Sequence, residues 1–189
     1  LLTLFPQFLY WKAASGSWLV NSYANNPGEG VDWFTPYLPQ VLFSFRKGWF
    51  LYTPLMVFAV AGLFFWRKFR KEQGNVALVV FLLFLYMVSS WTTWWYAESF
   101  SQRALVDIYP LLTISLGFLL LYVHKHRIRF VIFPLIGLLV AFNLFQTYQI
   151  TKGIIDGSRM TKAYYWSVFG QVSPPSETQK QLLPRRFFS

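Results

Sequence analysis

The chain contains no cysteine and only two histidines. Without a thiol it can form no disulfide, no thiolate metal site and no cysteine nucleophile, and the redox compartment stays open. The two histidines, His124 and His126, lie in a basic cluster with no ligand partner nearby, which favours solvated loop side chains. The sequence also shows no Gly-rich phosphate loop and no Ser/His/Asp set, so we predict no metal site and no evident cofactor.

Charged residues are scarce as well: they make up 13% of the 189 residues, and only seven are acidic. Hydrophobic residues make up 55% and the mean hydropathy is +0.38, which argues against a soluble globular chain. A net charge of +10 would suggest nucleic acid in a soluble protein, but here the basic residues cluster beside apolar runs. No nucleic-acid-binding motif is present, so we expect the lipid bilayer as a partner and no nucleic acid.

Four apolar runs each approach the roughly 20 residues that a helix needs to cross a bilayer. They cover about residues 49–66, 76–91, 104–123 and 130–146. A further apolar stretch before Lys12 is interrupted by Pro6 and Gln7, unlike a signal peptide, and predicts the end of a span whose beginning is missing. We therefore predict an all-α, polytopic membrane protein with about four full transmembrane helices and a partial N-terminal helix.

The runs divide the chain into three regions. Residues 1–48 would hold the end of the truncated span and an outer loop, whose turn cluster NNPGEG lies at 25–30. Residues 49–149 would form the four-helix transmembrane region, and residues 150–189 an outer tail whose aromatic patch (Tyr164, Tyr165, Trp166 and Phe169) packs on the interface.

Orientation follows from the basic loops. Seven of the 17 Lys and Arg residues fall in two short segments, 67–71 and 125–129. The positive-inside rule places both in the cytoplasm. The tail after residue 148 is basic too, against this rule, but long terminal segments bias orientation less than short loops do.

The segment 91–103, WTTWWYAESFSQR, lies between two of these runs. If the preceding helix continues, its three tryptophans and Glu98 share one helix face. On that face Trp94 and Trp95 would stack on a sugar ring, and Glu98 would bind its hydroxyls; the amide of Gln102 adds a further polar group. The alternative is an interfacial tryptophan belt beside a solvated glutamate.

Arg103 would begin the next span, with Ser101 as its N-cap. A helix N-terminus disfavours a cation and favours an anion, so the guanidinium and the helix end together suit a phosphate group. The alternative partner of Arg103 is Asp107, one turn further on. Arg46 and Lys47 would lie at the same surface as a second cationic arm, or else serve as interfacial anchors.

Four stretches carry a family resemblance: FPQFLYWK (5–12) followed by Gly16 and Ser17, LFSFRKGWFLYTP (42–54), WWYAESFSQR (94–103) and GIIDGSRMTKAYYW (153–166). They resemble bacterial polytopic glycosyltransferases of the GT-C superfamily, of the protein-mannosyltransferase-like and aminoarabinose-transferase-like kinds. The last stretch is similar to Bacteroidetes-type members. The third resembles the loop motif W-W-x-G-x-S-F-G-x-R, although Ala97 and Ser101 stand where glycine is usual.

This resemblance implies a GT-C-like fold and a multi-pass enzyme of the bacterial inner membrane. Such an enzyme moves a sugar from a polyprenyl-phosphate donor to an acceptor on the outer face. The partners implied are that lipid-linked sugar and the missing N-terminal half of the same protein, whose acidic first outer loop would supply the catalytic residue. No catalytic residue is therefore assigned here, and a divalent metal stays open for the complete enzyme.

Seven residues are expected to bind substrate: Arg46, Lys47, Trp94, Trp95, Glu98, Gln102 and Arg103. Arg103 would stabilise the charge on the leaving phosphate, with help from Arg46 or Lys47. The fragment alone is expected to be inactive. The alternative function is a non-catalytic membrane scaffold or partner-binding subunit.

Overall fold

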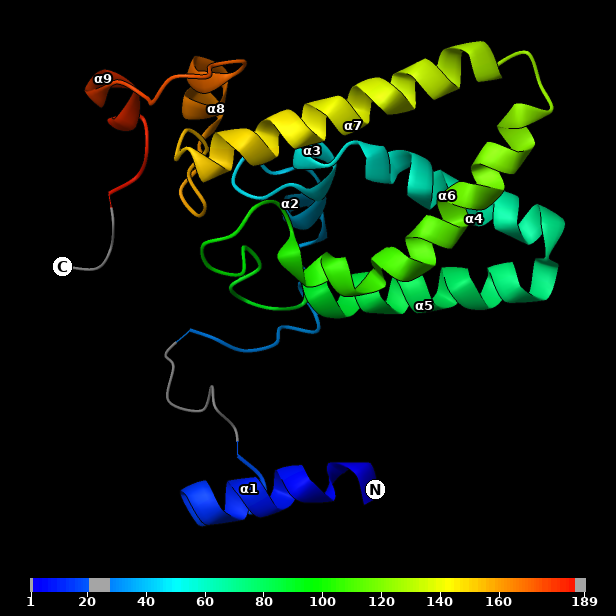
Figure 1. Ribbon diagram of the computed structural model, residues 1–189. Helices are drawn as coiled ribbons and strands as arrows, with labels where there is room; N and C mark the ends of the chain where they lie inside the picture. The colour runs from blue at the N-terminus through cyan, green and yellow to red at the C-terminus, as the bar shows by residue number, and fades with distance from the viewer. Residues whose placement is uncertain (1, 21–27, 186–189) are drawn as a thin grey trace. The chain divides into compact units, whose positions relative to one another are not determined.

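The computed structural model describes residues 2–20 and 28–185, and the chain divides into two compact units, 1–30 and 31–189 (Figure 1). The first unit contains the 3-10 helix η1 (Leu2–Leu4) and helix α1 (Phe5–Ser15). Gly16 ends α1 at a φ of 76°, a conformation that glycine adopts without strain, and donates its N–H to the carbonyl of Lys12. Residues 25–27 of the expected turn cluster lie outside the described residues.

The described part of the second unit is helical except for loops and one isolated antiparallel bridge between Val31 and Trp91. Its helices are α2 (Leu38–Phe43), α3 (Trp49–Tyr52), α4 (Leu55–Phe69), α5 (Lys71–Ser89), η2 (Arg103–Ile108), α6 (Tyr109–His124), α7 (Arg129–Thr151), α8 (Lys162–Val168) and α9 (Glu177–Lys180). The predicted all-α class is confirmed.

Among the described residues, three segments are long and apolar enough to cross a membrane: Lys71–Ser89, Arg103–His124 and Arg129–Thr151. The count of four spans is not confirmed, because the run expected at 49–66 is divided into α3 and the 15-residue α4. The break falls at Thr53, whose φ of −133° and ψ of 64° are not helical. Pro54 explains it, since a proline lacks an N–H and disfavours the helical conformation of the residue before it.

The closest helix contact joins α4 to α6. A Cβ added to Gly62 would lie 2.2 Å from the carbonyl oxygen of Ser115, so only glycine lets the two backbones approach this closely. The hydroxyl of Ser115 donates a hydrogen bond to the carbonyl of Ala59 across the same contact. Leu63 and Leu112 are buried beside it and belong to the main apolar core.

The two basic segments lie at the same end of the second unit, as Figure 1 shows at the α4–α5 and α6–α7 connections. We call this the basic end. The opposite end, which we call the aromatic end, carries α2, α3, the loop 90–102 and α8. There the tail packs on α3 through a second core that contains Tyr52, Tyr164 and Tyr165, whereas Trp166 is exposed. The three candidate spans and the two basic connections are thus compatible with the orientation expected from the basic loops.

Single cysteines test this orientation in a background free of native thiols. We expect Gln73→Cys and His126→Cys, both exposed at the basic end, to be shielded from a membrane-impermeant thiol reagent in intact cells. Thr178→Cys, exposed in the tail, should react under the same conditions. Permeabilised cells provide the control in which all three react, and the reverse labelling pattern would place the basic end outside.

Candidate functional site at the aromatic end

The loop 90–102 carries most of the predicted site residues, and it is not a continuation of α5. The helix ends at Ser89, where the backbone N–H groups of Asp32 and Tyr37 reach the carbonyls of Ser90 and Ser89. The single helix face expected for the three tryptophans and Glu98 is therefore wrong. Trp94 and Trp95 meet edge to face instead, with ring centroids 5.8 Å apart.

Three residues of this loop that are not glycine adopt a left-handed backbone: Tyr96, Ala97 and Ser101, with φ values of 47°, 55° and 51°. Each such residue costs on the order of 1 kcal/mol, and such strain persists only where surrounding contacts hold the backbone in place. Ser101 is also not the N-cap that the sequence predicted. That position belongs to Gln102, whose side chain makes no capping bond.

Lys47 holds the loop in place through two hydrogen bonds to Ser99. Its side chain is only 1% exposed, and its ammonium donates to the hydroxyl of Ser99 at 2.9 Å and to the carbonyl of the same residue. Burial, and then the positive charges of Arg103 and Arg46, lower the pKa of Lys47 to about 7. The buried amine thus holds the loop through Ser99.

Arg46 connects the loop to the C-terminal tail. Its guanidinium carbon lies 3.8 Å from the ring centroid of Trp95, a cation–π contact, and its Nε donates to the carbonyl of Ser158 at 2.7 Å. Burial lowers the pKa of Arg46. Both cations of the expected second arm are therefore engaged with the protein itself.

Arg103 is different from these two cations. It is exposed, and within the described residues it forms no hydrogen bond and no ion pair. The alternative pairing with Asp107 is not formed, although both residues lie on η2. The guanidinium is close enough to Lys47 to lower its pKa, which places an available cation beside the buried amine.

Gln102 and Glu98 occupy opposite environments. Gln102 is 1% exposed; its Nε2 donates to the carbonyl of Trp94 at 3.2 Å, while its Oε1 has no partner in the described part of the chain. This amide therefore shapes the loop from within. Glu98 is exposed and free of any hydrogen bond within the described residues, so it is available to a ligand.

The sequence did not single out Asp156 and Arg159 as site residues. Asp156 Oδ1 accepts the backbone N–H groups of Ser158 and Arg159, and its Oδ2 accepts Arg159 Nη2 at 2.7 Å. Burial raises the pKa of Asp156, but these hydrogen bonds outweigh it and leave the pKa below its ordinary value. In the sequence, this segment was marked by its Asp-Gly-Ser turn and by its place in the fourth stretch of the family resemblance.

Comparison with known proteins identifies no relative of this chain. No family model, no curated protein and no solved structure matches the chain.

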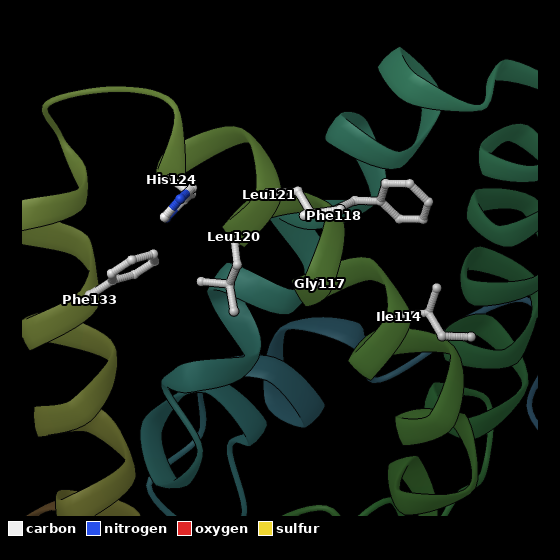
Figure 2. A pocket seen from close by; sticks show the side chains of 7 residues that line it. All are labelled: Ile114, Gly117, Phe118, Leu120, Leu121, His124 and Phe133. Atoms are coloured by element: carbon white, nitrogen blue, oxygen red, sulfur yellow. The ribbon is translucent and has the colours of Figure 1, made fainter.

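Within the described residues, no three or more His, Asp or Glu side chains are grouped so that they could hold a metal ion. A pocket of about 540 Å³ lies near the basic end, between α6 and α7 (Figure 2). Its lining is apolar apart from His124, which faces Phe133 with ring centroids 6.4 Å apart. It offers nothing to a phosphate or a sugar, so we place the candidate site at the aromatic end.

The lowered pKa of Lys47 predicts a pH-dependent stability. The folded protein releases this proton near pH 7, whereas the unfolded chain keeps it to its ordinary value of 10.5. Between these values the unfolded state binds more protons, so the free energy of unfolding rises with pH. We expect the Tm in detergent to rise by a few degrees from pH 6 to pH 9, on the order of the change that 1–2 kcal/mol causes. The Lys47→Met variant should lack the part of this rise in Tm that comes from Lys47. If Tm rises equally with pH in the two proteins, the amine stays charged in the folded state.

Proposed function

We propose that this chain is the C-terminal membrane portion of a GT-C-like glycosyltransferase. The complete enzyme moves a sugar from a polyprenyl-phosphate donor to an acceptor at the outer face of the bacterial inner membrane. The observation that carries the proposal is Arg103, an exposed guanidinium without a protein partner in the described residues, beside a loop that is held in a strained conformation. Strained backbone and available charge coincide at functional sites more often than elsewhere.

The backbone of the loop supports the family resemblance independently of its side chains. Ala97 and Ser101 occupy the two positions at which the family motif carries glycine, and both adopt positive φ. Glycine takes this conformation without the steric cost that an L side chain incurs. Positive φ at both positions is what a motif with glycine there would favour, and this supports the proposed resemblance.

In the reaction, the acceptor's hydroxyl or amine attacks the anomeric carbon of the sugar. The bond from that carbon to the phosphate oxygen breaks, a glycosidic bond forms, and polyprenyl phosphate leaves with the electron pair. The acceptor's proton passes to a base that the resemblance puts in the N-terminal half of the protein. Arg103 stabilises the negative charge on the departing phosphate, and a planar guanidinium can contact two of its oxygens at once.

The other predicted residues take different roles under this proposal. Lys47 and Arg46 position the loop through Ser99, Trp95 and Ser158. Glu98 binds sugar hydroxyls, and the tryptophans line the approach from the membrane interface.

One observation favours the alternative, a non-catalytic scaffold or partner-binding subunit. Helix α7 is apolar, yet only 6% of its most apolar stretch is buried against other described residues. An apolar helix with so little packing is available to the transmembrane helices of a partner, as a scaffold or partner-binding subunit requires.

The deciding experiment uses the complete protein in proteoliposomes that contain a synthetic polyprenyl-phosphate sugar. We expect release of polyprenyl phosphate that depends on the acceptor, and none from the 189-residue chain alone, since the implied catalytic acid lies outside it. No release by the complete protein with any donor sugar would favour the scaffold. Release by the short chain would assign the catalytic carboxylate to one of its own acids.

A further inference from the structure

A polar pocket of about 570 Å³ lies at the aromatic end, bounded by the loop 90–102, the turn 153–159 and the region of α9. Its volume falls in the range of roughly 300–1,000 Å³ that is typical of small-molecule sites. Its charged and aromatic lining comes from Glu98, Asp156, Arg159, Tyr164 and Lys180.

The charges of this lining balance. Glu98 and Asp156 are acidic, whereas Arg159 and Lys180 are basic, and Asp156 and Arg159 form an ion pair at 2.7 Å. An anion would meet two carboxylates in this pocket, and a cation would meet a guanidinium and an ammonium. A neutral ligand rich in hydroxyl groups avoids both penalties, because each hydroxyl donates to a carboxylate or accepts from a cation.

Two polar groups of the lining have no partner in the described chain. The Nε of Arg159 is buried and makes no hydrogen bond, although the two terminal nitrogens of the same side chain are bonded to Asp156 and Pro184. The carboxylate of Glu98 is exposed and unbonded within the described residues. The Nε of Arg159 is covered by protein atoms and lies out of reach of a ligand, whereas the exposed carboxylate of Glu98 can accept a hydroxyl from one.

The remaining walls are apolar. Tyr164 is fixed by the hydrogen bond from its hydroxyl to the carbonyl of Ile154, and Ile155 and Leu183 also line the pocket. A pyranose ring has an apolar face of C–H groups and a periphery of hydroxyls. The pocket combines a partly apolar wall with paired charges.

The loop 90–102, which precedes Arg103, forms one wall of the pocket. The backbone N–H of Ser99 donates to the carbonyl of Gly157 at 3.1 Å, and Lys47 holds the same serine from the other side. Asp156 and Glu98 both act on the charge of Lys47, as does Arg103. One buried lysine therefore has the available guanidinium and the pocket acids around it.

We propose that this pocket binds the pyranose ring of a neutral sugar, with Glu98 and the Asp156–Arg159 pair bonded to its hydroxyls. The inference deepens the proposed function and rests on it for the statement that the bound sugar is the transferred group. Binding of a sugar to this pocket is itself independent of catalysis.

The test is binding of three neutral probes, the methyl glycosides of glucose, galactose and mannose, to the 189-residue chain in lipid nanodiscs. We expect saturable binding of at least one in saturation-transfer NMR, with a Kd on the order of 1 mM, as is usual for ligands of this size. Glu98→Gln should weaken it about tenfold, because a charged acceptor is lost. Asp107→Asn, an exposed acid on η2 outside the pocket lining, is the matched control and should leave the Kd unchanged.

Further measurements distinguish failure of the sugar site from failure of the proposed function. Arg103→Ala should leave the Kd of the free glycoside unchanged, whether or not it abolishes transfer by the complete protein. Glycoside binding without sugar transfer by the complete protein would support the sugar-binding pocket and contradict the glycosyltransferase function. Absence of saturable binding by all three probes, equal affinities of Glu98→Gln and Asp107→Asn, or displacement of the glycoside by inorganic phosphate would overturn the sugar site.

Discussion

Arg103→Ala should lower turnover of a polyprenyl-phosphate sugar by the complete protein about a hundredfold while leaving membrane insertion intact. Loss of one charge-stabilising donor at a developing phosphate costs on the order of 3 kcal/mol. Arg103 is exposed and makes no hydrogen bond or ion pair within the described residues, so its removal deletes neither kind of interaction there. Arg103→Lys should restore only part of the rate, because an ammonium cannot reproduce the two parallel contacts of a guanidinium with phosphate.

The matched control is Asp107→Ala on the same short helix. If Arg103 served only to pair with Asp107, the two alanine variants would be equally impaired. The structure has no such ion pair, so we expect Asp107→Ala to retain near-normal turnover. Equal and small losses in both variants would remove Arg103 from the reaction. The measurement is initial release of polyprenyl phosphate at saturating acceptor.

Gly62→Val should produce the largest loss of stability among the variants proposed. A Cβ at this position would approach the carbonyl oxygen and carbonyl carbon of Ser115 at 2.2 and 2.5 Å, both of them backbone atoms of α6. The helices α4 and α6 must separate to admit it, which also breaks the hydrogen bond from Ser115 to Ala59. Overpacking of this kind costs roughly 1–3 kcal/mol, and more where the neighbour is rigid backbone, so we expect about 3 kcal/mol or outright misfolding.

Gly117→Val, on α6, controls for the change of residue alone. No atom lies within 4 Å of the Cβ that would be added there, so the effect should stay within about 0.5 kcal/mol. The comparison is thermal unfolding of both variants in one detergent, followed by tryptophan fluorescence. Similar midpoints for the two variants would mean that α4 and α6 are further apart than the structure shows.

The helical architecture could be predicted because its determinants are local. Apolar runs of nearly 20 residues and the basic connections between them fix the helices and their common basic end. The break of the first run could not be placed from Pro54 alone, because a proline near the start of a helix removes a backbone donor that has no partner there. What decides the break is the restriction that a proline places on the residue before it, here Thr53.

The site was predicted less completely, because its geometry depends on contacts between distant segments. The helical spacing of apolar residues continues through the tryptophans of 91–95, so the sequence does not reveal that α5 ends at Ser89. The helix ends there because the backbone of 32–37 donates hydrogen bonds to the carbonyls of Ser89 and Ser90. The burial of Lys47 follows from contacts 52 residues away, with Ser99. The role of Asp156 and Arg159 likewise appears only when the tail folds back onto the loop.

Binding of polyprenyl monophosphate to the 189-residue chain in nanodiscs tests the central claim most directly, namely that Arg103 receives a lipid-linked phosphate at the aromatic end. Polyprenol of the same length is the matched ligand, since it retains the tail and lacks the phosphate. We predict that the monophosphate binds at least about tenfold more tightly than the alcohol, and that Arg103→Ala abolishes this preference while Asp107→Ala keeps it. Equal binding of the two lipids, or a preference that survives in Arg103→Ala, would contradict the account.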